Sequence, residues 1–130
     1  MKEHILRLVP GQQLKMELIN YCRENEIHSG FVTGCAGSLK QLRIRLANAE
    51  NFREFDEELE IVSLQGSMCD DGVHLHISVA NQKGDAFGGH LVEGTVNTTA
   101  EILLIESEAF TLDRKYDEAT GYKELVIHRK

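Results

Sequence analysis

Three of the six histidines lie between residues 72 and 101, where the chemistry of the chain is most specific. His74 and His76 are separated by one residue, so in an extended strand their imidazoles point to the same side. His90 follows two glycines, which let the backbone turn tightly or approach another segment closely. Neutral imidazoles bind metal ions, and three of them leave one position for water or another ligand. The pattern predicts a three-histidine metal site.

A second interpretation of the same residues needs no metal. In an arbitrary His-x-His pair, the imidazoles are more often hydrogen-bonded polar groups on a solvent-facing strand. Three imidazoles also do not determine which metal ion binds. Zinc is our first choice, with nickel, copper and ferrous iron as alternatives. Glu93 and Glu101 are candidate hydrogen-bond acceptors for an imidazole N–H, or candidate general bases.

The strand that carries His74 and His76 is expected to have two different faces, with the histidines on one and the hydrophobic core against the other. Alternation along the segment places four apolar side chains on the other face, namely Val73, Leu75, Ile77 and Val79. Residues 59–66 alternate in the same way, and residues 69–72 have the composition of a turn. The two segments are therefore predicted to be antiparallel neighbours, with His90 reaching the site from a nearby turn.

The remaining segments predict a sheet and a helix that covers it. Residues 4–9 form a strand ended by Pro10 and Gly11, and residues 12–25 have the spacing of an amphipathic helix. The other expected elements are two strands with a glycine-rich break (30–46), a loop (48–58), a strand covered on both faces (100–105) and a hairpin (110–116 and 122–128). The expectation is an α+β fold, mainly an antiparallel twisted sheet packed with one or two helices.

Composition limits the classes of partner. The chain has 130 residues, which favours a single domain over residues 1–130. With 14 basic and 21 acidic residues its formal charge is −7, so the mean field repels nucleic acid. The weakly basic places are Lys40 with Arg43 and Arg45, Arg114 with Lys115, and Arg129 with Lys130. Solvated strand edges or a charged terminus explain them best.

The expected compartment is the cytoplasm. The first residues have no apolar signal core, and no run approaches the roughly 18 apolar residues that a membrane span requires. The three cysteines form no Cys-x-x-Cys pair, which favours reduced, packed thiols over a disulfide framework. We therefore expect no membrane partner.

Several glycine and histidine segments resemble a known family. Residues 71–80, with Gly84, residues 88–91, Gly94 and residues 98–102, are similar in type and spacing to the PPC domain. This is the "plants and prokaryotes conserved" domain, also called domain of unknown function 296. Residues 59–66 resemble the strand that precedes the family's turn, and residues 30–39 its glycine-rich strands. The resemblance covers nearly the whole chain.

The resemblance implies a compact α+β fold assembled as a homotrimer, in a stand-alone prokaryotic member. It also implies a metal, because some prokaryotic members hold one with the same three histidine positions. Plant members join this domain to AT-hook segments that contain Arg-Gly-Arg-Pro, and prokaryotic relatives are often labelled predicted DNA-binding proteins. This chain has a single proline, Pro10, and no such hook.

Three function classes follow. The first, which we favour, is a trimeric binding or regulatory module with a metal at His74, His76 and His90. The second is DNA binding, which the family label suggests and the acidic charge opposes. The third is a metal-dependent enzyme acting on a small molecule, with Glu93 or Glu101 as base. No nucleophile motif, P-loop or dinucleotide fingerprint supports an enzyme, and the small-molecule ligand is left open.

Overall fold

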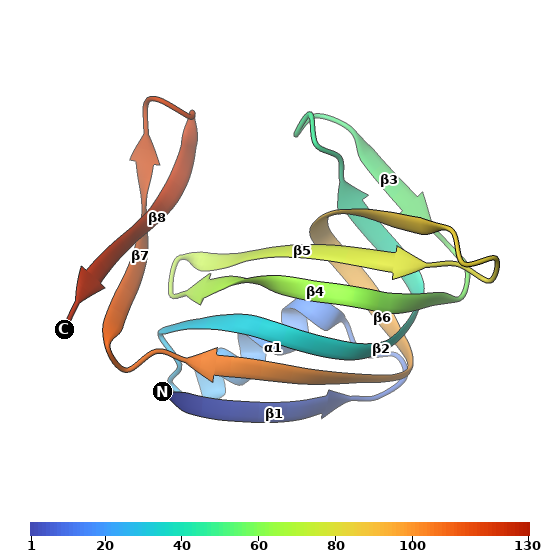
Figure 1. Cartoon of the computed structure of the whole chain (residues 1–130), viewed down its shortest axis with the longest axis horizontal. Coiled ribbons are helices and arrows are strands. Elements are labelled where there is room, and N and C mark those ends of the chain that lie inside the picture. The colour runs from blue at the N-terminus through green and yellow to red at the C-terminus, as the bar shows by residue number, and fades with distance from the viewer.

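The computed structural model describes residues 1–130 and contains eight strands and one helix (Figure 1). In chain order they are β1 (Lys2–Leu8), α1 (Leu14–Glu24), β2 (Ser29–Arg45), β3 (Phe52–Phe55), β4 (Leu59–Cys69), β5 (Gly72–Ala80), β6 (Ala86–Glu106), β7 (Phe110–Asp117) and β8 (Tyr122–Arg129). Six strands form a sheet in the order β1-β6-β5-β4-β2-β3, and β7 pairs with β8. All these pairings are antiparallel. The predicted α+β class is confirmed, with one helix.

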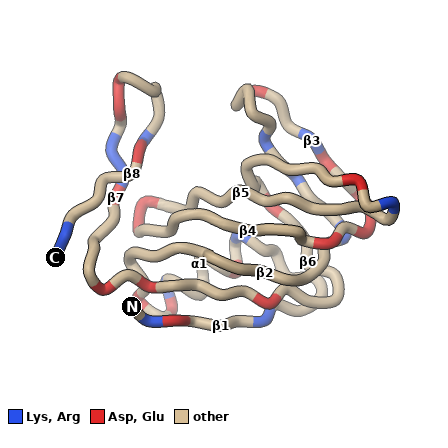
Figure 2. Tube along the Cα trace, viewed as in Figure 1, with Lys and Arg blue, Asp and Glu red and all other residues tan.

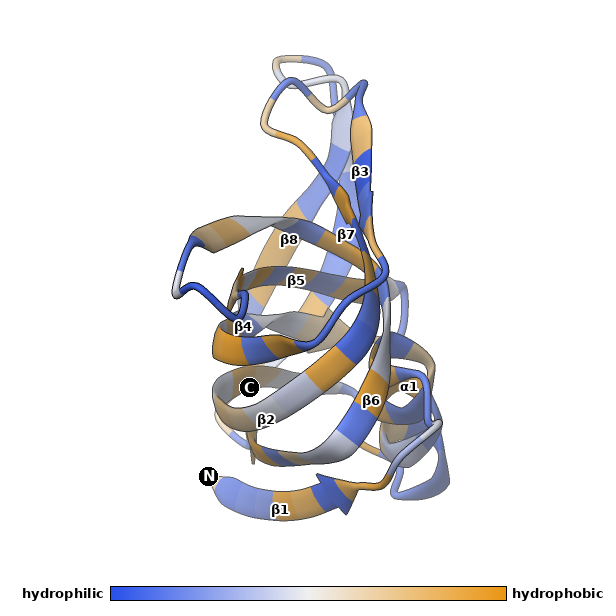
Figure 3. Cartoon of the chain, turned by 90° about the vertical axis from the view of Figure 1, so that its right-hand side faces the viewer, coloured by the Kyte–Doolittle hydropathy of each residue, from blue (hydrophilic) through white to orange (hydrophobic).

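Strands β2 and β6 hold the sheet together. The first residues of β6 pair with β5 and its last residues with β1, while β2 pairs with β6 along most of its length. Strand β2 also pairs with β4, and β4 pairs with β5. Strands β2, β4, β5 and β6 therefore form a closed circuit of pairings, which gives the sheet its strong curl in Figures 1 and 3.

Helix α1 packs against β6 at the side of the sheet (Figure 3). Its buried residues are Leu14, Leu18 and Cys22, which are four apart and form one stripe of the helix. Strand β6 supplies Ile102 and Leu104 to the same hydrophobic core. The amphipathic helix predicted over residues 12–25 is thus present with slightly shorter bounds. Its length and apolar character fall short of what a membrane crossing requires.

The apolar run of β6 is buried on one face only. Ile102 and Leu104 are almost fully buried, whereas Leu103 and Ile105, on the opposite face, are half-buried. Their neighbours across the sheet are Ile5 of β1, 74% exposed, and Phe31 of β2, 44% exposed. We call these four side chains the outer face. The continuous run predicted a strand covered on both sides, and within one chain this second side stays open.

The glycine-rich segment forms one long strand, β2, and the predicted break into two strands is wrong. A Cβ on Gly30 would lie 2.5 Å from the carbonyl oxygen of Ile105. A Cβ on Gly37 would overlap the carbonyl oxygen of Thr99. These glycines let β6 approach β2 closely. Gly37 thus supports the strand pairing at a place where a bend was expected.

Residues 48–58 were expected to form a loop, but they contain strand β3, paired with the end of β2. Phe55 of this strand is buried, and its ring centroid lies 5.3 Å from that of Phe87. Aromatic packing therefore outweighs the acidic residues around it. The predicted antiparallel pairing of β4 with β5 and the predicted hairpin at the C-terminal end are both confirmed.

The β7–β8 hairpin stands beside the large sheet (Figure 1). It is attached near the turn between β4 and β5. The guanidinium of Arg114 donates to Ser67 Oγ at 2.7 Å, and the Arg114 backbone N–H donates to Asp71 at 3.0 Å. Leu112 is buried, but three large side chains of the hairpin are exposed, namely Tyr116, Tyr122 and Ile127. Much of the hairpin's apolar surface thus has no cover within one chain.

Candidate metal centre

The three histidines of the predicted site come together on strands β5 and β6. His76 of β5 is the direct cross-strand partner of His90 of β6, and His74 lies two residues before His76 on the same face. Leu75 and Ile77, which alternate with these histidines, are buried. The alternation predicted for this strand is therefore confirmed, with an apolar face toward the core and an imidazole face toward solvent.

The imidazole nitrogens lie at distances that suit one shared ion. His74 Nε2 and His76 Nε2 are 3.2 Å apart, and one nitrogen from each of the three histidines lies within 4.8 Å of the others. In a tetrahedral zinc site, with Zn–N bonds of about 2.0–2.1 Å, two ligand nitrogens are about 3.3 Å apart. The His74–His76 separation already matches this value, and His90 offers a nitrogen within 4.8 Å of both.

His90 lies within a strand, and the turn predicted at this position is wrong. Gly88 and Gly89 belong to β6 and pair with β5. A Cβ on Gly89 would lie 2.7 Å from the carbonyl oxygen of Arg45, and one on Gly88 would lie 2.8 Å from that of Ile77. The two glycines let β6 fit tightly between β5 and β2. This fit places His90 beside His76.

The surroundings keep His74 and His90 uncharged at neutral pH. Burial, followed by the positive charge of Arg45 and the neighbouring imidazoles, lowers the pKa of His90 to about 4. Burial is also the main cause that lowers the pKa of His74, followed by the charges of His76 and Arg114. A metal ion binds the neutral imidazole, so these shifts reduce competition from protons.

One further observation supports a fit to a metal ion. The Nδ1 atom of His90 is buried and has no hydrogen-bond partner within the chain. A buried polar atom without a partner is costly, and an ion bound through Nδ1 would remove that cost. Together with three neutral nitrogen donors, this arrangement suits zinc and, equally by donor type, nickel, copper or ferrous iron.

Arg45 is a candidate functional residue that sequence reasoning missed. It was interpreted as a basic residue on a solvated strand edge, but it is the cross-strand partner of His90 on the side away from His76. Its Nε atom is buried and has no hydrogen-bond partner in the chain. The only available signal was its alternation with Ile44 and Leu46, which does not reveal the partner strand.

A cavity of about 590 Å³ is lined by His76, His90 and Arg45. Gly88 and Gly89 form part of its wall, and polar groups come from Ser63, Gln65 and Ser78. The hydroxyl oxygens of Ser63 and Ser78 are 3.2 Å apart and share a hydrogen bond. The site is thus an open hollow rather than a closed structural cage.

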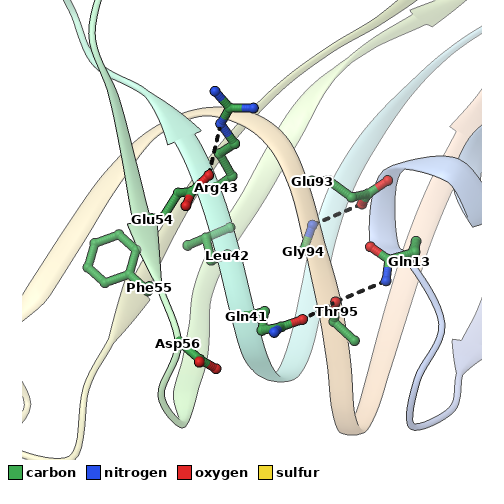
Figure 4. A pocket seen from close by; sticks show the side chains of 10 residues that line it. All are labelled: Gln13, Gln41, Leu42, Arg43, Glu54, Phe55, Asp56, Glu93, Gly94 and Thr95. Carbon is green, nitrogen blue, oxygen red and sulfur yellow. Dashed lines mark hydrogen bonds and ion pairs between the residues drawn. The ribbon is translucent and has the colours of Figure 1, made fainter.

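Glu93, a candidate partner of the histidines, has another role in the structure. It lines a second cavity, of about 420 Å³, together with Gln13 and Arg43 (Figure 4). One carboxylate oxygen accepts from the backbone N–H of Lys15 at 2.7 Å, and the other from that of Met16 at 3.2 Å. The carboxylate therefore binds the first N–H groups of α1.

Glu101, the other acidic candidate, lies in the opposite half of β6 from His90. It pairs with Arg7 of β1 and with Ala36 of β2, and its side chain is exposed. The group of potential ligands contains His74, His76 and His90. The structure brings together the three predicted histidines and leaves both glutamates outside the group.

All three cysteines are free. Burial raises the pKa of Cys22 and of Cys35 to about 11, with a smaller contribution from Glu106 and from Glu101, respectively. Both thiols stay protonated at neutral pH. They behave as small packing residues, in keeping with the expectation of reduced, packed thiols.

Comparison with known proteins agrees with this fold. A family model described as the Plants and Prokaryotes Conserved (PCC) domain matches residues 1–108. Two curated relatives from Synechococcus strains, each named Bifunctional protein GlmU, are 47% identical to this chain over 128 and 125 residues. These matches cover 98% and 95% of the chain but only 20% of each relative. The chain thus spans about a fifth of the curated relatives that it matches.

Solved structures of three bacterial and archaeal proteins have the same fold. A hypothetical protein from Salmonella is 33% identical, with a TM-score of 0.95 over 99% of this chain and 94% of the other. A protein from Archaeoglobus fulgidus, described as metal-containing, is 26% identical, with a TM-score of 0.83 over 97% and 94%. A candidate DNA-binding protein from Bacteroides thetaiotaomicron is also 26% identical, with a TM-score of 0.83 over 95% and 91%.

Proposed function

The chain belongs to the Plants and Prokaryotes Conserved (PCC) domain family, and we propose that it is a binding or regulatory module that holds one divalent metal ion. The observation that carries the proposal is the convergence of His74, His76 and His90, whose ligand nitrogens lie within 4.8 Å of one another. The similar Archaeoglobus fulgidus protein, described as metal-containing, supports it. Zinc is the first choice of ion, because three neutral imidazoles suit it well.

A binding role fits the surroundings of the site better than catalysis does. Three ligands leave one position for an exogenous group, but of the two candidate bases Glu93 is bound to the start of α1 and Glu101 lies outside the histidine group. In the Synechococcus relatives the matched segment is a fifth of a longer protein. A domain that recurs as a small part of larger proteins suits a module that binds a ligand and reports on it.

Elemental analysis tests the proposed metal site. Wild-type protein, purified without a tag and incubated with zinc, should hold about one zinc ion per chain. A His74→Ala, His76→Ala double variant should lose it, while His28→Ala should retain it, because His28 is paired with Asp70 outside the cluster. The proposal is contradicted if the wild-type protein holds far less than one metal ion per chain after incubation with zinc, nickel, copper and ferrous iron in turn. The three histidines would then be ordinary surface residues.

We also propose that the module assembles as a homotrimer. The family resemblance implies this state, and the outer face supports it, because Ile5 and Phe31 are exposed beside half-buried Leu103 and Ile105. The hairpin adds exposed Tyr116, Tyr122 and Ile127. Exposed apolar groups on two neighbouring elements suit burial against further copies of the chain.

DNA binding is the second candidate function. The similar Bacteroides thetaiotaomicron protein supports it, as do Arg43 and Arg53, exposed on the β2–β3 ribbon. Three observations oppose it. Arg43 Nε lies 3.4 Å from Glu54 Oε1, so its charge is paired. The guanidinium of Arg53 lies over the rings of Phe55 and Phe87. Lys and Arg are interspersed with Asp and Glu along the chain (Figure 2). Absence of a gel shift at low salt, with tens of micromolar protein, would remove this candidate.

A further inference from the structure

The guanidinium of Arg45 is in an unusual position for a cation in this chain. It lies next to His90, on the wall of the cavity of about 590 Å³, and its buried Nε has no hydrogen-bond partner. None of the ion pairs in the chain involves Arg45. A buried guanidinium N–H without an acceptor is costly, and a carboxylate or phosphate group is the best partner of a guanidinium.

We propose that this cavity binds a small molecule through an oxyanion group, a carboxylate or phosphate, held between Arg45 and the metal site. The inference rests on the proposed function, because the divalent ion supplies two of the three positive charges that select the ligand. It goes further by naming the class of ligand and the residue that recognises it.

Charge balance is the first support. Three neutral imidazoles add no negative charge to a divalent ion, and Arg45 adds another positive charge beside them. No carboxylate lines the cavity. Arg45 and Lys15 are among the charges that act on His90, and a carboxylate, Glu124 of β8, acts on His74. An exogenous anion would supply the missing negative charge.

The contrast with the other cavities strengthens this support, because the chain as a whole is acidic. The cavity in Figure 4 is also lined by an arginine, Arg43. Three acidic residues, Glu54, Asp56 and Glu93, line the same cavity. A third cavity, of about 480 Å³, is lined by Glu26, Asp70 and Asp71 among others. The cavity beside the histidines combines an arginine with no acid, which is the charge pattern of an anion site.

Hydrogen-bonding capacity is the second support. The fork of an arginine suits the two oxygens of a carboxylate or phosphate. On the same cavity wall, the Ser63 and Ser78 hydroxyls bond to each other, and only one of their two protons is needed for that bond. One hydroxyl proton is therefore free to be donated to an anion. Gly88 and Gly89 contribute only backbone atoms to this wall.

The test uses the zinc-loaded full chain and two simple probes, acetate and inorganic phosphate, titrated by calorimetry. At least one probe should bind with a dissociation constant tighter than about 1 mM, and neutral acetamide should not. Acetate and phosphate in separate arms tell which oxyanion the cavity prefers. In cobalt-loaded protein, the same anion should change the visible absorption spectrum of the ion, which reports a ligand at or beside the metal.

The decisive variant is Arg45→Gln, which should weaken anion binding roughly 10- to 100-fold, as expected for loss of a charged hydrogen-bond partner. Arg43→Gln is the matched control. It lies two residues away on the same strand and changes the net charge equally, but it lines the other cavity. It should leave anion affinity unchanged. Zinc content, measured on every sample, should be the same in both variants and the wild type.

The two proposals fail separately. If the wild type takes up no metal, the proposed function fails, and this inference fails with it. If zinc binds fully but neither acetate nor phosphate binds, only the inference is overturned. It is also overturned if acetamide binds as tightly as acetate, or if Arg45→Gln binds anions as tightly as Arg43→Gln does.

Discussion

Glu93 Oε1 accepts a hydrogen bond of 2.7 Å from the backbone N–H of Lys15, so a residue of strand β6 caps helix α1. Gln13, the residue that precedes the helix, provides no side-chain cap of its own. The first N–H groups of a helix lack partners within the helix and carry a partial positive charge. A carboxylate from outside the helix meets both needs and fixes the helix to the sheet.

Glu93→Gln should therefore lower the free energy of unfolding by about 1 kcal/mol, the usual size of a capping contribution. Chemical denaturation measures the change. The control is Glu101→Gln, an exposed residue elsewhere on the same strand, which should change stability little. Zinc content should stay at the wild-type level in both. Loss of zinc without loss of stability in Glu93→Gln would instead assign the carboxylate to the metal site.

Gly89→Ala should destabilise the protein by about 1–3 kcal/mol and reduce zinc binding. The new Cβ would lie 2.7 Å from the Arg45 carbonyl oxygen, so β6 must move away from β2 at the residue next to His90. Gly34→Ala is the control, because its Cβ meets only Leu103, at 3.9 Å. Thermal melting and elemental analysis measure the two effects. Equal behaviour of the two variants would contradict the role assigned to close strand approach.

The metal-free protein should lose stability as the pH falls from 6.5 toward 4. In this window the unfolded chain protonates His90 with its ordinary pKa of 6.5, whereas folded His90 resists protonation down to a pKa of about 4. The unfolded state thus binds more protons, and acid favours it. His90→Gln should lose less stability than the wild type between these pH values. Urea denaturation at several pH values provides the comparison.

His28 supplies a control of opposite sign for this pH dependence. A hydrogen bond to Asp70 raises the pKa of His28 in the folded state. Its contribution to stability is therefore present below pH 6.5 and is lost as the pH rises through the raised pKa. His28→Gln should accordingly be less stable than the wild type at acid pH and equal to it at alkaline pH. Parallel curves for the wild type and His90→Gln would refute the assigned shift of His90.

Phe31→Glu should dissociate the proposed trimer into smaller species. The side chain is 44% exposed on the outer face, and a carboxylate there would be buried without a partner in an assembled interface. Met16→Glu is the control, because Met16 is 51% exposed on helix α1, away from the outer face. Light scattering coupled to size-exclusion chromatography gives the mass. A monomeric wild type, or an unaffected Phe31→Glu, would contradict the proposal.

Local sequence patterns were sufficient to predict the half of the site that lies on one strand. His74 and His76 alternate with Leu75 and Ile77, and a period of two determines which side chains share a face. The helix was equally accessible, because Leu14, Leu18 and Cys22 repeat every four residues. In both segments the information that defines the structure lies within a few neighbouring residues.

The missing parts depended on contacts between segments far apart in the chain. Gly88 and Gly89 predicted either a tight turn or a close approach of another segment, and the sequence did not show that they admit the carbonyl oxygens of Ile77 and Arg45. Strand β3 was missed because Phe55 is buried by packing against distant segments of the core, such as Phe87 of β6. Arg45 was judged a surface residue because its pairing with His90 follows from strand register, which the local pattern does not encode.

The pairing of β2 with β6 extends from Gly30 with Glu106 to Arg45 with His90, across several irregularities. In a sheet, a slip of one residue turns every side chain to the opposite face. Such a slip would carry His90 away from His76 and into the hydrophobic core, while Leu91 would emerge in its place. The spacing of the three imidazoles therefore depends on the register of β2 and β6 along their whole length. A shift of that register would remove His90 from the group of three ligands.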